Sequence, residues 1–457
     1  MELLSIPSDA AAAALDERLT EEPPPSVRSE GQRDRDRILY SSAFLRLGHV
    51  TQVATPETGF IFHSRLTHSI KVAQVARGLA HRLKHLARNG ELDPGATKLV
   101  GHLDEDATEA AALAHDLGHP PFGHLAEKVL QKRAKHATFE GNAQSFRIVT
   151  RLALRTANSG DGQAPVGLNL TRRTLNGILK YPWLREEEPE EHHKKWGAYP
   201  DGDKKAFEWT RRGFPEGERS LEACLMDWAD DVTYAVHDMD DFFRARLIPL
   251  ERLTTPDSGE LERFQRHLRE RAADLSGRPG EEPERYPEAA ERFFTEGPVS
   301  AITLPFSGRT DERVTLRQLG SHLIGLYISA LQLRDARDGK SVELVIDDAI
   351  VDQVKVLKQL TWFYVINRPS LAVIQRGQTQ VIETLFGMYR SAVTAGESHL
   401  LPPLFAERVE EVTSEASRER VVIDLIAGMT ESSAAEIYRQ RTGVTHGSVL
   451  AQVAGPA

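Results

Sequence analysis

One short stretch of the chain concentrates residues that could bind a metal ion or move protons. The stretch AALAHDLGHPPFGHLAE, residues 111–127, supplies three imidazoles and two carboxylates. An alanine-rich helix is expected over residues 105–117, with Gly118 as its stop. The two prolines that follow fix the backbone dihedral, so these side chains are placed before a substrate arrives. The stretch therefore predicts a preorganised site for metal binding or acid–base chemistry.

Four residues on three expected helices complete a set of metal ligands. His115 and Asp116 end the helix just described, His68 lies in RLTHS on an earlier helix, and Asp230 lies in WADDVTYAVHD on a later one. Two imidazoles and two carboxylates suit a divalent ion, with Mn or Mg expected first and Fe, Co, Ni or Zn as alternatives. Four protein ligands leave open positions on a six-coordinate ion for water and a phosphate oxygen. Metal-assisted hydrolysis of a phosphoester needs this arrangement.

The composition describes a globular protein of acidic net charge. The chain has 457 residues, of which 40% are hydrophobic and 27% charged, and its formal net charge is −10. An anionic substrate must therefore be held by local cations or a metal, because the overall field repels it. The single cysteine, Cys224, is expected to be a buried thiol in a reducing compartment. Without a leader-like or membrane-spanning segment, the chain is expected to be cytoplasmic, with no membrane partner.

The hydrophobic pattern is helical for most of the chain and predicts an all-α fold. Apolar residues recur at helical spacing after RLTHS and again after Ser220. The stretch RDGKSVELVIDD is the exception and could hold a short β-hairpin. We expect four parts: a mobile acidic and proline-rich segment (1–30), a catalytic core (31–250), a less regular insertion or lid (251–320), and a C-terminal helical part packing on the core (321–457).

The motifs RLTHS, AHDLGHPPFGH, FEGNAQSFRI and ADDVTYAVHD stand in this order along the chain. This set resembles the HD-domain deoxynucleoside triphosphate triphosphohydrolases, the dGTPase-like family, over roughly residues 30–245. A weaker likeness surrounds YVINRPSLAVIQRGQ. The resemblance implies an all-α metal-dependent phosphohydrolase fold that cleaves a dNTP at the α-phosphorus into deoxynucleoside and inorganic triphosphate. It also implies that the metal ligands are His68, His115, Asp116 and Asp230.

The resemblance further implies catalytic and substrate-binding roles for residues around these ligands. In catalysis, His124 would act as general acid, Glu127 would orient it, and His119 would face the phosphates. Asp230, Tyr234 and Asp238 stand four apart and share one helical face, so the metal, the sugar and a further polar contact would lie together. The substrate-binding set comprises Arg65 for the triphosphate, Tyr234 and Asp238 for the sugar, and Arg46 and Asn142, with Lys180 and Glu140 nearby.

Two alternatives remain open at the level of the sequence. One is another HD phosphohydrolase, acting on nucleoside monophosphates, cyclic nucleotides or guanosine tetraphosphate. The other is a nucleotide-sensing or single-stranded DNA-binding protein with vestigial catalysis, although the intact ligand set favours an enzyme and no long basic stripe is interleaved with aromatic residues. The family resemblance also implies a homo-oligomer, and it leaves open whether a dNTP effector binds. It leaves open weak single-stranded DNA binding and whether the substrate is dGTP or any dNTP.

Overall fold

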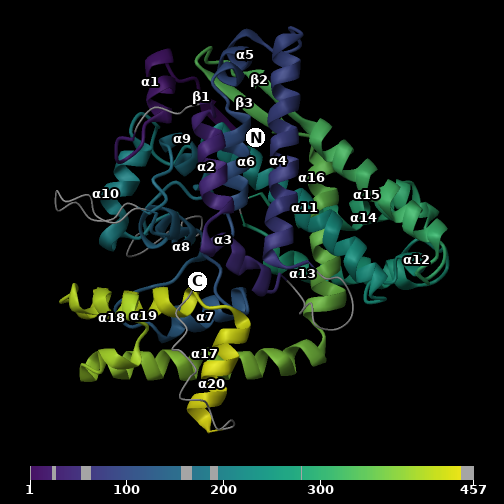
Figure 1. Ribbon diagram of the computed structural model, residues 1–457. Helices are drawn as coiled ribbons and strands as arrows, with labels where there is room; N and C mark the ends of the chain where they lie inside the picture. The colour runs from purple at the N-terminus through teal and green to yellow at the C-terminus, as the bar shows by residue number, and fades with distance from the viewer. Residues whose placement is uncertain are drawn as a thin grey trace.

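The structure, a computed structural model, describes residues 2–22, 27–52, 63–155, 167–185, 194–278 and 280–443. Helices account for most of it, and a single small sheet lies at one end of the described part (Figure 1). The predicted all-α fold is confirmed in this sense. The N-terminal half contains α1 Asp9–Ala13, α2 Glu30–Leu39, α3 Ser42–Arg46, α4 Arg65–Arg88, α5 Pro94–Gly101, α6 Glu105–Ala114, α7 His124–Arg133, α8 Gly141–Arg147, α9 Arg172–Ile178 and α10 Pro200–Arg211.

The helices that carry the metal-ligand set pack against one another in the centre of the molecule. Helix α4 contacts α6, and α11 (Leu221–Arg244) contacts both. Each of the three begins at a side chain that accepts a backbone N–H, namely Ser64, Asp104 and Ser220. Their facing sides are lined by small and aliphatic residues, so the backbones approach closely. The ligands on these helices are thereby fixed relative to one another.

Residues 2–5 lie within the segment that we expected to be mobile (1–30), and they form a strand of the small sheet. Strand β1 (Glu2–Ser5) pairs antiparallel with β3 (Ser341–Ile346), which also pairs with β2 (Leu331–Asp335). Leu4 is only 1% exposed. A four-residue strand carries too weak a pattern to be recognised alone, because its pairing partner lies more than 330 residues away. The hairpin predicted around RDGKSVELVIDD is confirmed, with β3 inside this stretch and β2 just before it.

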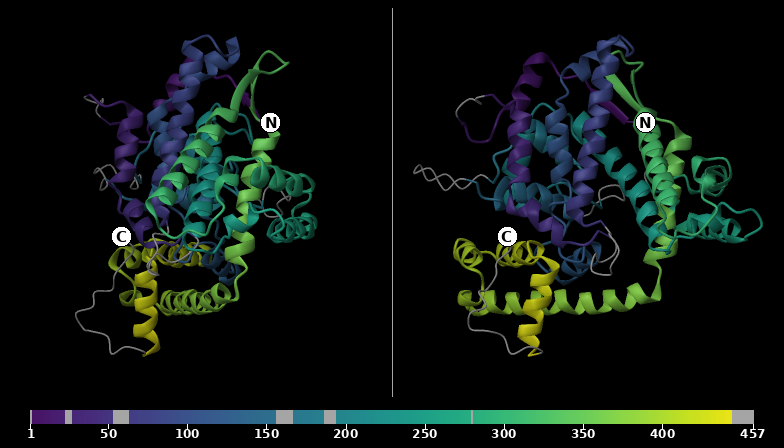
Figure 2. Two further views of the ribbon diagram at one scale, coloured as in Figure 1. Left: turned by 90° about the vertical axis from the view of Figure 1, so that its right-hand side faces the viewer. Right: turned by 45° about the vertical axis from the view of Figure 1, so that its right-hand side comes forward.

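The predicted insertion is more regular than expected. It contains α12 Leu250–Leu253, α13 Glu260–Leu275, α14 Tyr286–Thr295 and α15 Thr310–Ala330. Phe264, Phe293 and Phe294 are buried between these helices and join the main hydrophobic core. Proline, glycine and charge are concentrated in the connections and on the exposed faces, and this composition concealed the helices. Figure 2 shows these helices projecting to one side of the core.

The C-terminal region builds a second hydrophobic core. It contains α16 Asp348–Thr361, a π-helical turn at Trp362–Ile366, α17 Pro369–Ala395, α18 Pro403–Glu410, α19 Glu415–Ala427 and α20 Glu431–Thr442. Apolar residues of α17, α19 and α20 form this core together with Ala126, Val129 and Leu130 of α7. The main core, in contrast, runs from Leu4 to Val365. The main core contains residues on both sides of positions 250 and 320, whereas the buried apolar residues of α7 belong to the second core.

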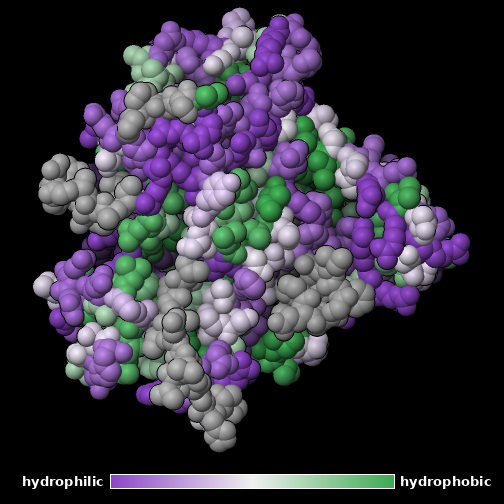
Figure 3. Space-filling view, in the orientation of Figure 1, coloured by the Kyte–Doolittle hydropathy of each residue, from purple (hydrophilic) through white to green (hydrophobic). Residues whose placement is uncertain are grey.

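The outer surface agrees with the composition of a folded, charged protein. On the face of the molecule drawn in Figure 3, hydrophilic side chains cover the upper part and apolar side chains gather nearer the middle. Among the described residues, no helix is long and apolar enough to cross a membrane.

Candidate metal centre and adjoining cleft

The structure brings the four predicted metal ligands together. His68 Nε2 lies 3.0 Å from Asp230 Oδ1, and His115 Nε2 lies 3.5 Å from Asp116 Oδ1 and 3.6 Å from Asp230 Oδ1. Donor atoms of His68, His115 and Asp116 all lie within 4.8 Å of one another. The ligands converge because α4 and α11 present their side chains toward the C-terminal end of α6.

The residues present fit a divalent metal ion. His115 Nδ1 lies 2.7 Å from the carbonyl of Ala112, and this contact leaves Nε2 free to be a ligand. That Nε2 is buried and has no hydrogen-bond partner among the described residues, which is costly for a polar atom unless something binds it. The donor set of two imidazoles and two carboxylates is one that metal ions of the first transition row accept.

Asp116 lies at the electrostatic centre of the site. Arg65 Nη1 lies 2.7 Å from its Oδ2, and His119 Nδ1 lies 3.0 Å from its Oδ1. Burial alone would raise the pKa of Asp116, but His119, Arg65 and His115 outweigh burial and lower it well below its usual range. Burial would likewise lower the pKa of His115, yet Asp116 and Asp230 raise it to about 9. Asp116 is therefore ionised, and the raised pKa of His115 shows that the surrounding carboxylates favour positive charge in the site.

The loop between α6 and α7 is held by close packing, and the role of Gly118 differs from the prediction. Gly118 does not adopt the left-handed conformation expected of a helix stop. Its Cα instead lies so close to the Gly141 carbonyl and the Ser145 amide that a Cβ would collide with both. The left-handed residues are Phe122 (φ 67°) and Gly123 (φ 58°), which turn the chain into α7.

His124 and Glu127 begin α7 and form a pair facing the cleft. His124 Nδ1 lies 2.9 Å from Glu127 Oε2, and Glu127 Oε1 accepts the N–H of Gly141 at 2.9 Å. Burial opposes ionisation of Glu127, but His124 and His119 lower its pKa to about 2. Burial and the nearby Glu127 raise the pKa of Glu140 to about 7. The pair thus has a carboxylate that holds the imidazole in one orientation.

Two connected cavities, of about 350 and 860 Å³, form the cleft above the metal centre. The smaller one is lined by the metal ligands other than His68 and by most of the predicted site residues: Arg65, His119, His124, Glu127, Glu140, Asn142, Lys180 and Tyr234. Asn142 donates to Glu140 at 2.7 Å, and Lys180 forms an ion pair with Asp227. Asp238 does not line either cavity; it lies buried behind Tyr234 on α11.

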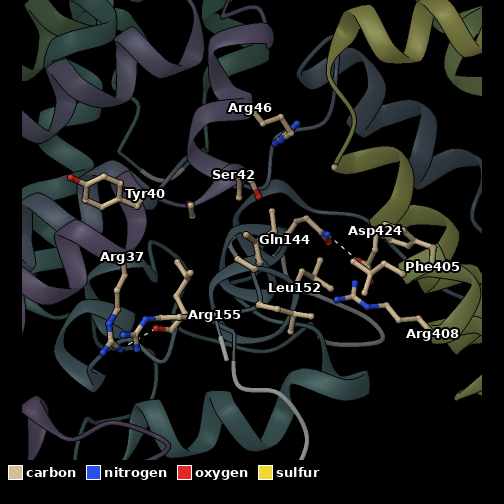
Figure 4. Close-up of a pocket in the computed structure, with 18 residues that line it drawn as sticks. Arg37, Tyr40, Ser42, Arg46, Gln144, Leu152, Arg155, Phe405, Arg408 and Asp424 are labelled. Carbon is tan, nitrogen blue, oxygen red and sulfur yellow. Dashed lines mark hydrogen bonds between the residues drawn. The ribbon is translucent and has the colours of Figure 1, made fainter. Parts of the chain in front are cut away.

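Arg46 does not reach the cleft, and its predicted contact with substrate is not supported by its position. Its guanidinium is buried and donates to the carbonyls of Leu117, His119 and Met429 at 2.7, 2.8 and 3.0 Å. Figure 4 shows the side chain above a different cavity, across from Gln144 and Asp424. Arg46 therefore supports the loop that carries the ligands, from the side opposite the cleft.

Several cleft residues come from parts of the chain that our site prediction did not include. Gln52, Lys195, Lys358 and Trp362 line the same cavities as the metal ligands. Lys358 forms a 2.6 Å ion pair with Asp231, which lines the same cavity. The weak likeness around YVINRPSLAVIQRGQ was the signal that the C-terminal region contributes to the cleft, since Ile366 lies in that stretch and Trp362 two residues before it.

Comparisons with known proteins place this arrangement in a family. Residues 65–235 match the HD domain, and residues 344–440 match the phosphohydrolase-associated domain. Together with the site, the matched domains define a metal-dependent HD phosphohydrolase. The chain belongs to the family of deoxyguanosinetriphosphate triphosphohydrolase-like proteins, as the sequence resemblance predicted. Such a protein of Corynebacterium efficiens is 36% identical, with 92% of each chain covered. Relatives of Streptomyces coelicolor (34%, 91% of this chain and 93% of the relative) and Vibrio parahaemolyticus (30%, 90% and 93%) carry the same description.

Proposed function

We propose that this protein hydrolyses deoxynucleoside triphosphates at the α-phosphorus and releases the deoxynucleoside and inorganic triphosphate. The observation that carries the proposal is that three of the four predicted metal ligands, His115, Asp116 and Asp230, line one cavity together with the His124–Glu127 pair. A phosphorus atom held between the two groups would have a metal on one side and a proton donor on the other. The names of the relatives support a deoxynucleotide triphosphate as substrate.

Several residues of the cavity have a role in this reaction. His68, His115, Asp116 and Asp230 would hold a divalent metal, which would supply Lewis acidity for activation of the attacking water. Arg65 stands beside Asp116 and can bind phosphate oxygens with its remaining N–H groups. Lys180 and Lys195 add positive charge at the cavity wall, which a triphosphate needs in a protein of net charge −10. Tyr234 offers an aromatic surface to the sugar.

The leaving group determines the role of His124. Cleavage at the α-phosphorus expels the 5′ oxygen of a nucleoside, an alkoxide that leaves poorly unless it receives a proton. His124 is the exposed imidazole of the pair, with a side chain 67% accessible, so it can reach a substrate in the cleft. Glu127 pairs with Nδ1 of His124, so Nε2 of His124 is left to deliver the proton. The proton then leaves with the deoxynucleoside, and the oxygen of the attacking water stays on the triphosphate.

The proposal is tested by product identity. Each dNTP is incubated singly and then with the other three, in Mn²⁺ or Mg²⁺, and the products are resolved by anion exchange. We expect deoxynucleoside and intact triphosphate, and we expect Asp116→Asn to lose turnover by at least roughly 100-fold because it removes a ligand. Release of phosphate or of monophosphate with pyrophosphate would instead indicate another HD phosphohydrolase activity.

A further inference from the structure

A second group of metal-binding side chains lies beside the first. Donor atoms of His119, His124 and Glu127 all lie within 4.8 Å of one another, and none of the three belongs to the four-ligand set. In a tetrahedral zinc site with bonds of about 2.1 Å, the ligand atoms stand roughly 3.4 Å apart. His124 Nδ1 and Glu127 Oε2 are already 2.9 Å apart. Only a small movement of the side chains would therefore enclose an ion.

Two of these residues have polar neighbours on the side away from the proposed ion. His119 Nδ1 lies 3.0 Å from Asp116 Oδ1 without forming a hydrogen bond to a described residue, and its Nε2 is left to be the ligand. Glu127 Oε1 accepts the N–H of Gly141, so the carboxylate is fixed while Oε2 remains available. A Cβ on Gly141 would lie 3.4 Å from Glu127 Oε1 and 3.5 Å from His119 Nε2. The absence of a side chain at this position keeps the space beside both ligands open.

The group is also accessible from the cleft, and a further acidic side chain lies beside it. The His124 side chain is 67% exposed, so an ion can enter from the cleft without opening the fold. Glu140 is a second buried carboxylate beside Glu127, and the proximity of the two raises the electrostatic cost of the site without a cation. A bound divalent ion would relieve that repulsion.

We propose that His119, His124 and Glu127 form a second, inhibitory site for a zinc-like divalent cation. Two imidazoles and one carboxylate are a ligand set that Zn²⁺ accepts with an open fourth position, whereas Mg²⁺ prefers oxygen ligands. An ion here occupies the imidazole nitrogen and carboxylate oxygen that the general acid needs. Zn²⁺ therefore inhibits turnover supported by Mg²⁺ or Mn²⁺ at the first site. The predicted inhibition of turnover rests on the proposed function, whereas the binding of zinc at this site does not.

Metal stoichiometry tests the site without reference to turnover. Untagged, metal-free protein is dialysed against buffered Zn²⁺, and bound zinc is measured by mass spectrometry. We expect two ions per chain in the wild type and in His136→Ala, a matched exposed histidine outside the cleft. His68→Ala, which damages only the first site, and His124→Ala, which damages only the second, should each bind one. One ion in the wild type, or two in His124→Ala, would overturn the proposal.

Inhibition supplies the second readout. In Mg²⁺, Zn²⁺ should inhibit wild-type turnover, and Glu127→Gln should need at least roughly 10-fold more Zn²⁺ for the same fractional inhibition. Equal sensitivity of the two proteins would contradict the inhibitory role of the site. Two bound zinc ions in a protein that cleaves no dNTP would leave the second site standing and overturn the proposed function. One bound zinc ion per chain in a protein that does cleave dNTPs would leave the proposed function standing and overturn the second site.

Discussion

At the scale of single residues, His124 is proposed to transfer a proton to the leaving group, and this role can be separated from substrate binding. His124→Ala should lower dNTP turnover by about 10²–10⁴-fold, because a positioned general acid contributes this much. The p-nitrophenyl ester of triphosphate should lose less than about 10-fold, since nitrophenolate leaves without a proton. Steady-state kinetics on both substrates measures the difference. Equal losses on the two substrates would show that His124 has another role.

Glu140 provides a residue-scale prediction about pH. Its pKa is raised to about 7, so between pH ~4.5 and 7 the folded protein retains a proton that the unfolded chain releases. Stability therefore falls as the pH rises through this window. Because glutamine does not ionise, the free energy of unfolding of Glu140→Gln should rise relative to wild type by up to about 3 kcal/mol across the window.

Urea unfolding of the metal-free proteins at pH 5, 6, 7 and 8 measures this change. Glu140 Oε2 also accepts the N–H of Ala143 at the start of α8, and the loss of that cap shifts the stability of the variant equally at every pH. A difference between the two proteins that is independent of pH would therefore contradict the raised pKa.

The sequence predicted site residues best where one motif placed them next to each other or on one helical face. His115, Asp116, His124 and Glu127 belong to one sequence motif that runs from the end of α6 into the first turn of α7, and Tyr234 follows Asp230 by one helical turn. Arg46 could not be placed, because a cation in a helix reveals nothing about which side of a loop it supports. Asp238 was placed on the same face of α11 as Asp230 and Tyr234, but it does not line the cleft. How far the cleft extends along that face depends on the packing of neighbouring elements, which the sequence motif does not reveal.

At the scale of elements, the loop between α6 and α7 depends on a close approach to α8. Gly118→Ala should destabilise the protein by more than about 2 kcal/mol and reduce turnover, because a Cβ would collide with backbone atoms of α8. Gly101→Ala is the control, since a Cβ there would meet nothing within 4 Å and alanine favours the helix. The free energy of unfolding and the turnover are measured for both variants, and equal stability of the two would contradict the predicted collision at Gly118.

The long helices around the site could be predicted because their apolar stripes span several turns. Helix α11 begins after Ser220 as expected, and the predicted metal ligand Asp230 lies at the edge of its buried face. The helices of residues 251–320 escaped prediction because their apolar residues alternate with proline- and glycine-containing connections. Strand β1 escaped because four residues gain stability only from a partner that is distant in the sequence.

At the scale of the whole molecule, α7 joins the catalytic loop to the second hydrophobic core. Leu385 on α17 is fully buried in this core. Leu385→Ala should cost about 2–5 kcal/mol of stability and also lower kcat, since the core that positions His124 would loosen. Val373→Ala, at a position 74% exposed on the same helix, should leave both unchanged. An unchanged kcat per folded molecule in Leu385→Ala would show that α7 is positioned independently of this core.

The central claim is cleavage between the α-phosphorus and the 5′ oxygen by a water held at the metal centre. The most direct measurement is hydrolysis of a dNTP in ¹⁸O-labelled water, with mass analysis of both products. The account predicts one labelled oxygen in intact inorganic triphosphate and an unlabelled deoxynucleoside. Label in the deoxynucleoside, or release of pyrophosphate or phosphate in place of triphosphate, would contradict it.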